Sequence, residues 1–203
     1  MSNHTGQDLV GVAAIIKSGP FLVLEIQKPH KWVHTPLALR VGAGCIGGAM
    51  ENGESPIDAL QRESVEEIGI NIEVLSAGAT LLWTRSGTLQ QIDWPYGAPR
   101  PALLWEVDPE FGKGRVAVYL GTAIGEPKPG DLPALLLLGP ELVHDLLGDE
   151  WSLQRILDAG GTIRAGQPVP LQALIQPRGT VAVLREMAID HSDEVGRILT
   201  LAT

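Results

Sequence analysis

Residues 55–69 carry both a start signal and a stop signal for an α-helix, and no other segment of the chain constrains the fold as strongly. Ser55 is a preferred N-cap, and Pro56 follows at the first helical position, where a missing N–H costs nothing. Asp58 stands three residues after the cap, near the positive end of the helix dipole. Gly69 is placed to end the helix. Apolar residues recur between these ends at helical spacing, at Ile57, Leu60, Val65 and Ile68.

The segments around this helix indicate a mixture of strands and helices. Residues 9–17 and 21–26 are apolar runs joined by a Ser-Gly-Pro turn, which predicts an antiparallel hairpin. Glycines at 42, 44, 47 and 48 favour neither helix nor strand, so we expect a loop there whose backbone approaches another group closely. Further strands are expected over 70–74, 79–84, 103–107, 115–124 and 180–184, and helices over 141–147, 151–159 and 193–201. Residues 93–101 and 125–130 read as loops. This mixture predicts an α+β or α/β sandwich rather than a helical bundle.

Composition excludes several classes of protein. With 203 residues, 44% of them hydrophobic and 19% charged, the chain is long and apolar enough to fold around its own core and is not intrinsically disordered. The formal net charge of −9 leaves no basic face for nucleic acid. An anionic small molecule is still compatible with this charge, because a bound divalent cation inverts the local field.

The sequence also indicates a reducing compartment. Cys45 is the only cysteine, so no disulfide framework forms within one chain, and we expect it to be a small buried residue rather than a nucleophile. The first residues show no secretory signal, and no apolar run approaches the roughly 20 residues of a membrane-spanning helix. We therefore expect a cytoplasmic protein with neither a membrane nor nucleic acid as its partner.

Three carboxylates gather near the end of the predicted helix. Glu63, Glu66 and Glu67 are three and four residues apart, which places them on one helix face, and like charges at this spacing destabilise a helix. Arg62 reaches Glu66 on the next turn, but one guanidinium does not neutralise three carboxylates. Carboxylate oxygens suit Mg²⁺ or Mn²⁺, so a divalent cation is one interpretation. The alternative is a solvated acidic face with no chemical role.

The wider pattern resembles a known family. Residues 48–70 read GAMENGESPIDALQRESVEEIGI. This segment resembles the Nudix box, G-x5-E-x7-R-E-U-x-E-E-x-G-U, in which U is aliphatic. The match comprises Gly48, Glu54, Arg62, Glu63, Glu66, Glu67, Gly69 and Ile70. Ser64 replaces the usual aliphatic residue, and it is small enough to pack behind the helix.

The resemblance implies a fold and an activity. The fold would be α/β, a Nudix-type α/β/α sandwich around a mixed β-sheet. We expect one domain over residues 1–203, with a core over about 9–148 and residues 149–203 as a C-terminal extension that either caps the substrate pocket or forms a homodimer interface. The activity would be hydrolysis of a phosphoanhydride in a nucleoside diphosphate linked to another moiety, with Mg²⁺ or Mn²⁺ required.

The resemblance also implies roles by position. Glu66 and Glu67 would be metal ligands together with the carbonyl of Gly47, and Glu63 would be a further ligand or the base for the attacking water. Arg62 would orient the glutamates. The remaining matches, Glu54, Gly48 and Gly69, would be structural, with Glu54 bracing the junction of loop and helix. A later carboxylate serves as the base in many members of the family, and Asp131 and Glu106 are the candidates here.

The identity of the substrate is less constrained. Residues 85–88 occupy the window in which ADP-ribose and dinucleoside polyphosphate subfamilies carry a proline or a tyrosine, and neither is present. Trp32 is a candidate for substrate binding, because its indole can stack on a base while the neighbouring Lys28, His30, Lys31 and His34 attract phosphate. Arg40 and Arg85 are further candidates for substrate binding. The alternative for Trp32 is an anchor in a solvated polar loop.

Two rival functions remain. A Nudix-fold sensor would bind a nucleotide derivative without turnover, but such proteins usually lose box glutamates and gain a DNA-binding module. A sandwich protein with a merely structural acidic helix would bind no divalent metal.

Overall fold

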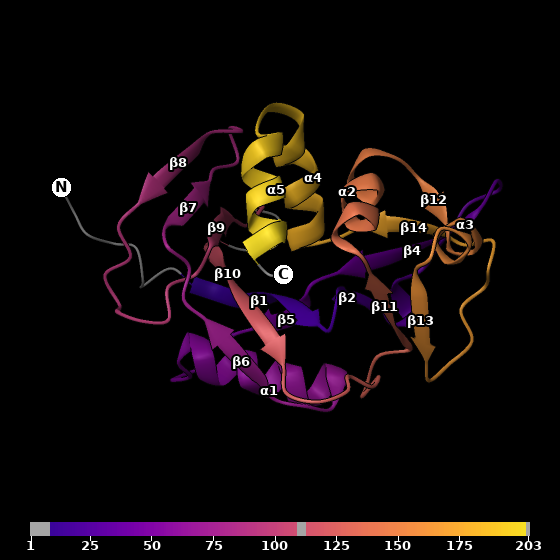
Figure 1. Cartoon of the computed structure of the whole chain (residues 1–203), viewed down its shortest axis with the longest axis horizontal. Coiled ribbons are helices and arrows are strands. Elements are labelled where there is room, and N and C mark those ends of the chain that lie inside the picture. Colours follow the sequence, from indigo (N-terminus) through magenta and orange to yellow (C-terminus); the bar gives the residue numbers. More distant parts are fainter. Residues whose placement is uncertain (1–8, 109–112, 202–203) are drawn as a thin grey trace.

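The computed structural model describes residues 9–108 and 113–201, and its described strands join one mixed sheet with helices on both faces. Helix α1 (Pro56–Ile68) covers one face, at the bottom of Figure 1. Helices α2 (Pro140–Gly148), α4 (Thr180–Asp190) and α5 (Ser192–Leu201) lie on the other face, and the short helix α3 (Leu153–Asp158) lies near the end of the sheet that carries β12–β14. The predicted α/β sandwich around a mixed sheet is confirmed.

The centre of the sheet is formed by the N-terminal hairpin and its neighbours. Strand β1 (Leu9–Ser18) pairs antiparallel with β2 (Phe21–Ile26), so the predicted hairpin is confirmed. On its other side β1 runs parallel to β10 (Arg115–Ala123). Strand β5 (Ile46–Ala49) also pairs with β1, and β4 (Leu39–Gly44) pairs with β2. The box therefore begins within β5, a strand paired with the centre of the sheet.

The remaining strands extend the sheet in both directions. The main order is β12-β14-β4-β2-β1-β10-β9-β7-β8, and β3, β5, β6, β11 and β13 pair with members of this path or with each other. Their bounds are β3 (Val33–His34), β6 (Ile72–Leu75), β7 (Thr80–Trp83), β8 (Leu89–Ile92), β9 (Leu103–Glu106), β11 (Ala134–Leu138), β12 (Trp151–Ser152), β13 (Thr162–Ala165) and β14 (Leu174–Pro177), with a 3₁₀ turn at η1 (Pro29–Lys31). Because β14 runs parallel to β4, the C-terminal extension is built into the sheet.

Alternation along β1 divides the core into two layers. Val12, Ala14 and Ile16 are buried with the apolar residues of α1. Ala13 and Ile15 are buried with residues of α2, α4 and α5 on the opposite face. The sheet thus separates the box helix from the C-terminal helices.

The local signals of α1 are realised as predicted. The Ser55 hydroxyl accepts a hydrogen bond from the backbone N–H of Asp58, and Gly69 ends the helix with a left-handed φ of 71°. Ser64 is fully buried and its hydroxyl donates to the carbonyl of Leu60 at 2.7 Å. An aliphatic residue is therefore not needed at this position to fill the space behind the helix.

The expectation of a loop over the glycines at 42–48 was wrong. These residues form β4 and β5. Glycine is required in these strands because side chains from other elements occupy the space that a Cβ would fill. A Cβ on Gly44 would lie 2.8 Å from the Glu25 carboxylate, and one on Gly48 would meet the Glu63 carboxylate. The predicted close approach to the glycine backbone is therefore present, but the groups that approach it are the side chains of Glu25 and Glu63, and the backbone is that of strands.

The expectation of a strand over 180–184 was also wrong. The β-branched residues there favour a strand, yet residues 180–190 form α4, with Val181, Leu184 and Met187 buried at helical spacing. The helix expected over 151–159 begins only at Leu153, after the two-residue strand β12. The other predicted helices and strands are confirmed to within about two residues at their ends.

Candidate active site

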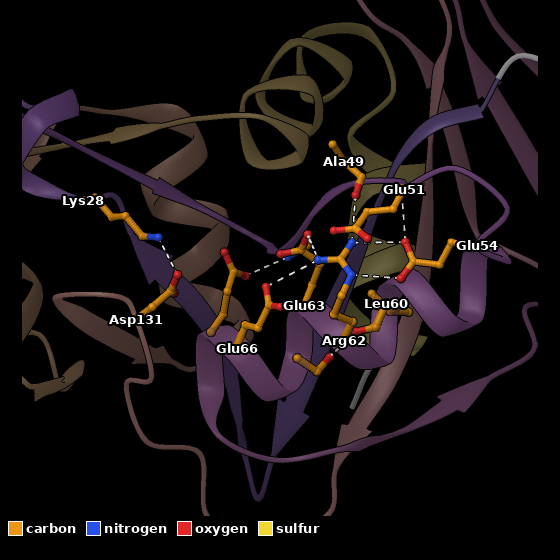
Figure 2. A network of polar contacts seen from close by, with 12 residues as sticks. Lys28, Ala49, Glu51, Glu54, Leu60, Arg62, Glu63, Glu66 and Asp131 are labelled. Carbon is orange, nitrogen blue, oxygen red and sulfur yellow. Dashed lines mark hydrogen bonds and ion pairs between the residues drawn. The ribbon is translucent and has the colours of Figure 1, made fainter.

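Arg62 holds the acidic side chains of the box together. Its guanidinium donates to Glu54 at 2.9 Å, to Glu63 at 2.8 Å and to Glu66 at 3.4 Å, and it also donates to the carbonyl of Ala49 at 3.0 Å. Figure 2 shows the guanidinium with Glu54 on one side and Glu63 and Glu66 on the other. The contact with Ala49 ties the helix to the end of β5. One cation therefore fixes two carboxylates of α1 relative to the strand and the loop before the helix.

Glu67 connects α1 to β5 by a second route. Its side chain is only 9% exposed, and it accepts a hydrogen bond from the backbone N–H of Gly47 at 2.9 Å. Burial, followed by the nearby charge of Glu25, raises the pKa of Glu67 to about 8, although the hydrogen bond from Gly47 lowers it. The fold thus holds a carboxylate in an environment that disfavours its negative charge.

Glu25 is a site residue that the sequence reasoning missed. It lies on β2, and burial raises its pKa to about 7, with the charges of Asp131 and Glu63 acting in the same direction. Lys31 and Lys28 oppose this rise. The available signal was a single carboxylate within the otherwise apolar run of residues 21–26. Three elements therefore contribute acids to one region: α1, β2 and the loop before β11.

Of the two later carboxylates, the structure brings Asp131 to this region. Asp131 forms an ion pair with Lys28 at 2.5 Å, at the left of Figure 2, and its backbone N–H donates to the carbonyl of Glu66. Glu106 lies on β9, where Arg85 and Arg115 are within 4 Å of its carboxylate. Position thus favours Asp131 over Glu106 as an additional carboxylate near the box.

The chemistry of these residues fits a hard divalent cation. Their donors are carboxylate oxygens, which suit such an ion. The negative charges of Glu67 and Glu25 repel each other, and Lys28 and Lys31 offset this repulsion only in part. Within residues 9–108 and 113–201, no three His, Cys, Asp or Glu side chains lie close enough to hold one ion between them. Arg62 occupies the carboxylates of Glu63 and Glu66 in this arrangement.

A cavity of about 270 Å³ adjoins Gly47, whose N–H donates to Glu67. Gly47 and Gly48 form part of its wall, and Glu25 lines it from β2. Trp105 of β9 and residues 178–180, at the start of α4, complete the wall on other sides. The cavity therefore lies next to the box and also touches the C-terminal extension.

The three predicted substrate-binding residues do not line this cavity. The indole N–H of Trp32 donates to the carbonyl of Gln27 at 2.6 Å, and its ring packs against the core. Arg40 pairs with Glu150, and Arg85 lies near Glu106. A role in substrate binding for these residues stays a prediction.

Cys45 borders the same cavity but is only 8% exposed. Burial raises the pKa of its thiol to about 12, so the thiolate is not populated at neutral pH. The expectation of a small buried residue is confirmed.

The family follows from a comparison with family models. The model described as NUDIX domain matches residues 8–132, which is well over half of the chain. The chain belongs to the Nudix family. Nudix hydrolases generally use divalent metal cations and act on small nucleotide derivatives, and the family match supports a Nudix-type pyrophosphohydrolase.

Solved structures of the Nudix family are similar to this chain. A Nudix-family hydrolase from Clostridium perfringens has 18% identity over 66% of this chain and 83% of that one, with a TM-score of 0.45. A MutT Nudix hydrolase from Burkholderia pseudomallei has 24% identity over 66% and 84%, with a TM-score of 0.40. An ADP-ribose pyrophosphatase from Streptococcus suis has 15% identity over 64% and 73%, with a TM-score of 0.40. No curated protein matches the chain.

No helix in the described part of the chain is long and apolar enough to span a membrane.

Proposed function

We propose that this Nudix protein hydrolyses a phosphoanhydride bond in a nucleoside diphosphate linked to another moiety, with Mg²⁺ or Mn²⁺ as its metal. The observation that carries the proposal is the joint anchoring of the box acids. Arg62 holds Glu63 and Glu66, and the Gly47 N–H holds Glu67, beside a cavity that Gly47 itself lines. This arrangement supports a reaction at the edge of that cavity. Residues 1–203 would act as one domain, because β14 of the extension pairs with β4.

Each residue of the box has a proposed part in the reaction. Glu66 and Glu67, with the Gly47 carbonyl, would hold the metal, which when bound neutralises phosphate charge and makes a coordinated water more acidic. Arg62 would keep the carboxylates pointing toward one another. Glu54 would keep Arg62 in place through its two hydrogen bonds with the guanidinium.

The attacking water must lose a proton to a carboxylate. As its oxygen bonds to phosphorus, the anhydride P–O bond breaks and the leaving phosphate carries away the bonding electron pair. Two carboxylates are the proposed acceptors of the proton, Glu63 and Asp131. Glu63 is paired with Arg62, and Asp131 is paired with Lys28. Comparing E63Q with D131N distinguishes them, since removing the true base flattens the rise of kcat with pH.

The test of the proposal is a panel of potential substrates. NDP-sugars, ADP-ribose, NADH, dinucleoside polyphosphates and (d)NTPs are incubated with wild type and E67Q in Mg²⁺, Mn²⁺ or EDTA. E73Q is the matched control, because Glu73 is an exposed glutamate on β6 outside the network. We expect metal-dependent turnover that E67Q lowers by about 10²–10⁴-fold and E73Q leaves unchanged.

Two results would contradict the proposal. One is equal turnover by E67Q and E73Q. The other is tight nucleotide binding with no turnover by wild type, which would indicate a sensor instead.

A further inference from the structure

The cavity beside the box has a wall that comes from outside the region matched by the family model. Residues 178–180 line it, whereas the match ends at residue 132. Their place is fixed by the sheet: Pro177, the last residue of β14, is the register partner of Ala43, and the Arg178 N–H then donates to the Ala43 carbonyl at 2.8 Å. The extension thus carries Arg178 to the side of β4 that faces the cavity.

A side-chain contact fixes the same segment from the opposite side. The indole N–H of Trp105, on β9, donates to the hydroxyl of Thr180 at 3.2 Å. Thr180 is 3% exposed, so this contact lies in the interior. Trp105 and Thr180 both line the cavity. The backbone that carries the Arg178 side chain is therefore held from two sides, by β4 through Ala43 and by β9 through the contact of Trp105 with Thr180.

The charge of Arg178 is not compensated by an acid of the described chain. Its guanidinium donates to the side-chain carbonyl of Gln176 at 3.1 Å, and within residues 9–108 and 113–201 it makes no ion pair. By contrast, Arg62 and Arg40 are paired with glutamates. Arg178 is exposed, so its donors are accessible to an anion from solution.

Glu25 and Arg178 flank the same backbone position. A Cβ on Gly44 would lie 2.8 Å from the Glu25 carboxylate and 3.5 Å from the Arg178 carbonyl. The Arg178 side chain lies over the next glycine of the same face, because a Cβ on Gly42 would be 2.7 Å from its Cγ. The cavity is thus lined by Glu25 on the side of the box and by Arg178 on the side of the extension. This arrangement suits a nucleoside diphosphate. A metal held by the acids would bind one set of phosphate oxygens, and the Arg178 guanidinium would bind another.

We propose that Arg178 binds a phosphate of the nucleotide substrate and is a substrate-binding residue supplied by the extension. This inference rests on the proposed function. The planar guanidinium offers paired N–H donors that match phosphate oxygens. Arg178 has no part in breaking the anhydride bond, so its contribution is to binding in the ground state and the transition state alike.

The test compares R178Q and R178K with R185Q as the matched control. Arg185 lies on helix α4, which begins two residues after Arg178; it makes no ion pair within the described residues and does not line the cavity. KM and kcat are measured on the compound that the panel selects. Affinity for ADP and for inorganic pyrophosphate is measured by calorimetry in EDTA, where no metal-dependent turnover occurs.

We expect R178Q to raise KM and the Kd for ADP by about 10- to 100-fold while kcat changes less than about threefold. R178K should recover part of the affinity, and R185Q should behave as wild type. Equal affinities for R178Q and wild type, or equal losses in R178Q and R185Q, would overturn the inference.

The two proposals fail in distinguishable ways. Turnover that requires Glu67 but is indifferent to Arg178 refutes only the role of Arg178. No turnover by wild type, with ADP binding that is weakened in R178Q, refutes only the hydrolase. A wild-type protein that neither turns over the panel nor binds ADP or pyrophosphate refutes both.

Discussion

Replacing Glu25 by Gln removes a carboxylate that the fold keeps beside Glu67, Glu63 and Asp131, and we expect this change to stabilise the metal-free protein at pH 8. Burial is the main reason, because β2 holds the partly buried side chain in the wall of the cavity, next to other acids. Gln has a similar shape and retains hydrogen-bonding groups, so the substitution removes charge with little loss of packing. The expected gain in the free energy of unfolding depends on pH, so the prediction is tested by a pH profile rather than by one value.

The size and sign of the effect follow from the pKa of Glu25. Its folded-state pKa of about 7 lies above its ordinary value of 4.5. Between these values the folded protein keeps a proton that the unfolded chain has released, so the free energy of unfolding falls as pH rises. Each pH unit of difference corresponds to about 1.4 kcal/mol, which gives about 3 kcal/mol at pH 8. This is an upper bound, because Glu67 titrates in the same range and shares the repulsion. Below pH 4.5 the cost disappears.

The assay is urea unfolding in EDTA at pH 4, 6 and 8 for wild type, E25Q and the exposed control E73Q. We expect E25Q to gain about 1–3 kcal/mol over wild type between pH 4 and pH 8. E73Q should follow wild type. Parallel pH profiles for E25Q and wild type would refute the reasoning, whatever their absolute stabilities.

Three further substitutions test other parts of the structure. R62A leaves partly buried carboxylates unpaired, so we expect a loss of about 1–3 kcal/mol in urea unfolding and at least a tenfold fall in kcat, with R62K intermediate; unchanged stability would contradict this. G47A should destabilise by about 3 kcal/mol or more in thermal unfolding, because φ is +147° and a Cβ would collide with the Val12 backbone; an unchanged Tm would be the contrary result. S64A removes only the hydrogen bond to Leu60, so we expect a loss below about 1.5 kcal/mol and wild-type kcat; a large fall in kcat would show that the serine has a role in the reaction.

The sequence predicts α1 well because the determinants of this helix are local. Ser55 caps it, Gly69 ends it and the apolar spacing sets its buried face, all within one segment. Strands β4 and β5 could not be predicted in this way. Glycine disfavours strands locally, and only the tertiary structure shows that Glu25 and Glu63 occupy the space above Gly44 and Gly48. Likewise, α4 is set by the face that it buries, which overrides the local preference of its β-branched residues.

The same division applies to the candidate site. The contact of Arg62 with Glu66 follows from helical spacing, and it is present at 3.4 Å. Glu25 and Arg178 could not be assigned from the sequence, because they reach the site through the pairing of β2 and β14 with β4. Distance along the chain hides such residues, and only the sheet topology brings them together.

The central claim is that water attacks a phosphoanhydride at the box glutamates, and the most direct measurement is turnover in ¹⁸O-enriched water. The compound selected by the panel is hydrolysed by wild type and by E67Q with Mg²⁺ or with EDTA, and the products are analysed by mass spectrometry. We expect one ¹⁸O atom in a phosphate product for each bond cleaved by wild type with Mg²⁺, and almost no product with EDTA or from E67Q. Unlabelled phosphate products, or labelled products formed equally fast by E67Q, would contradict the claim.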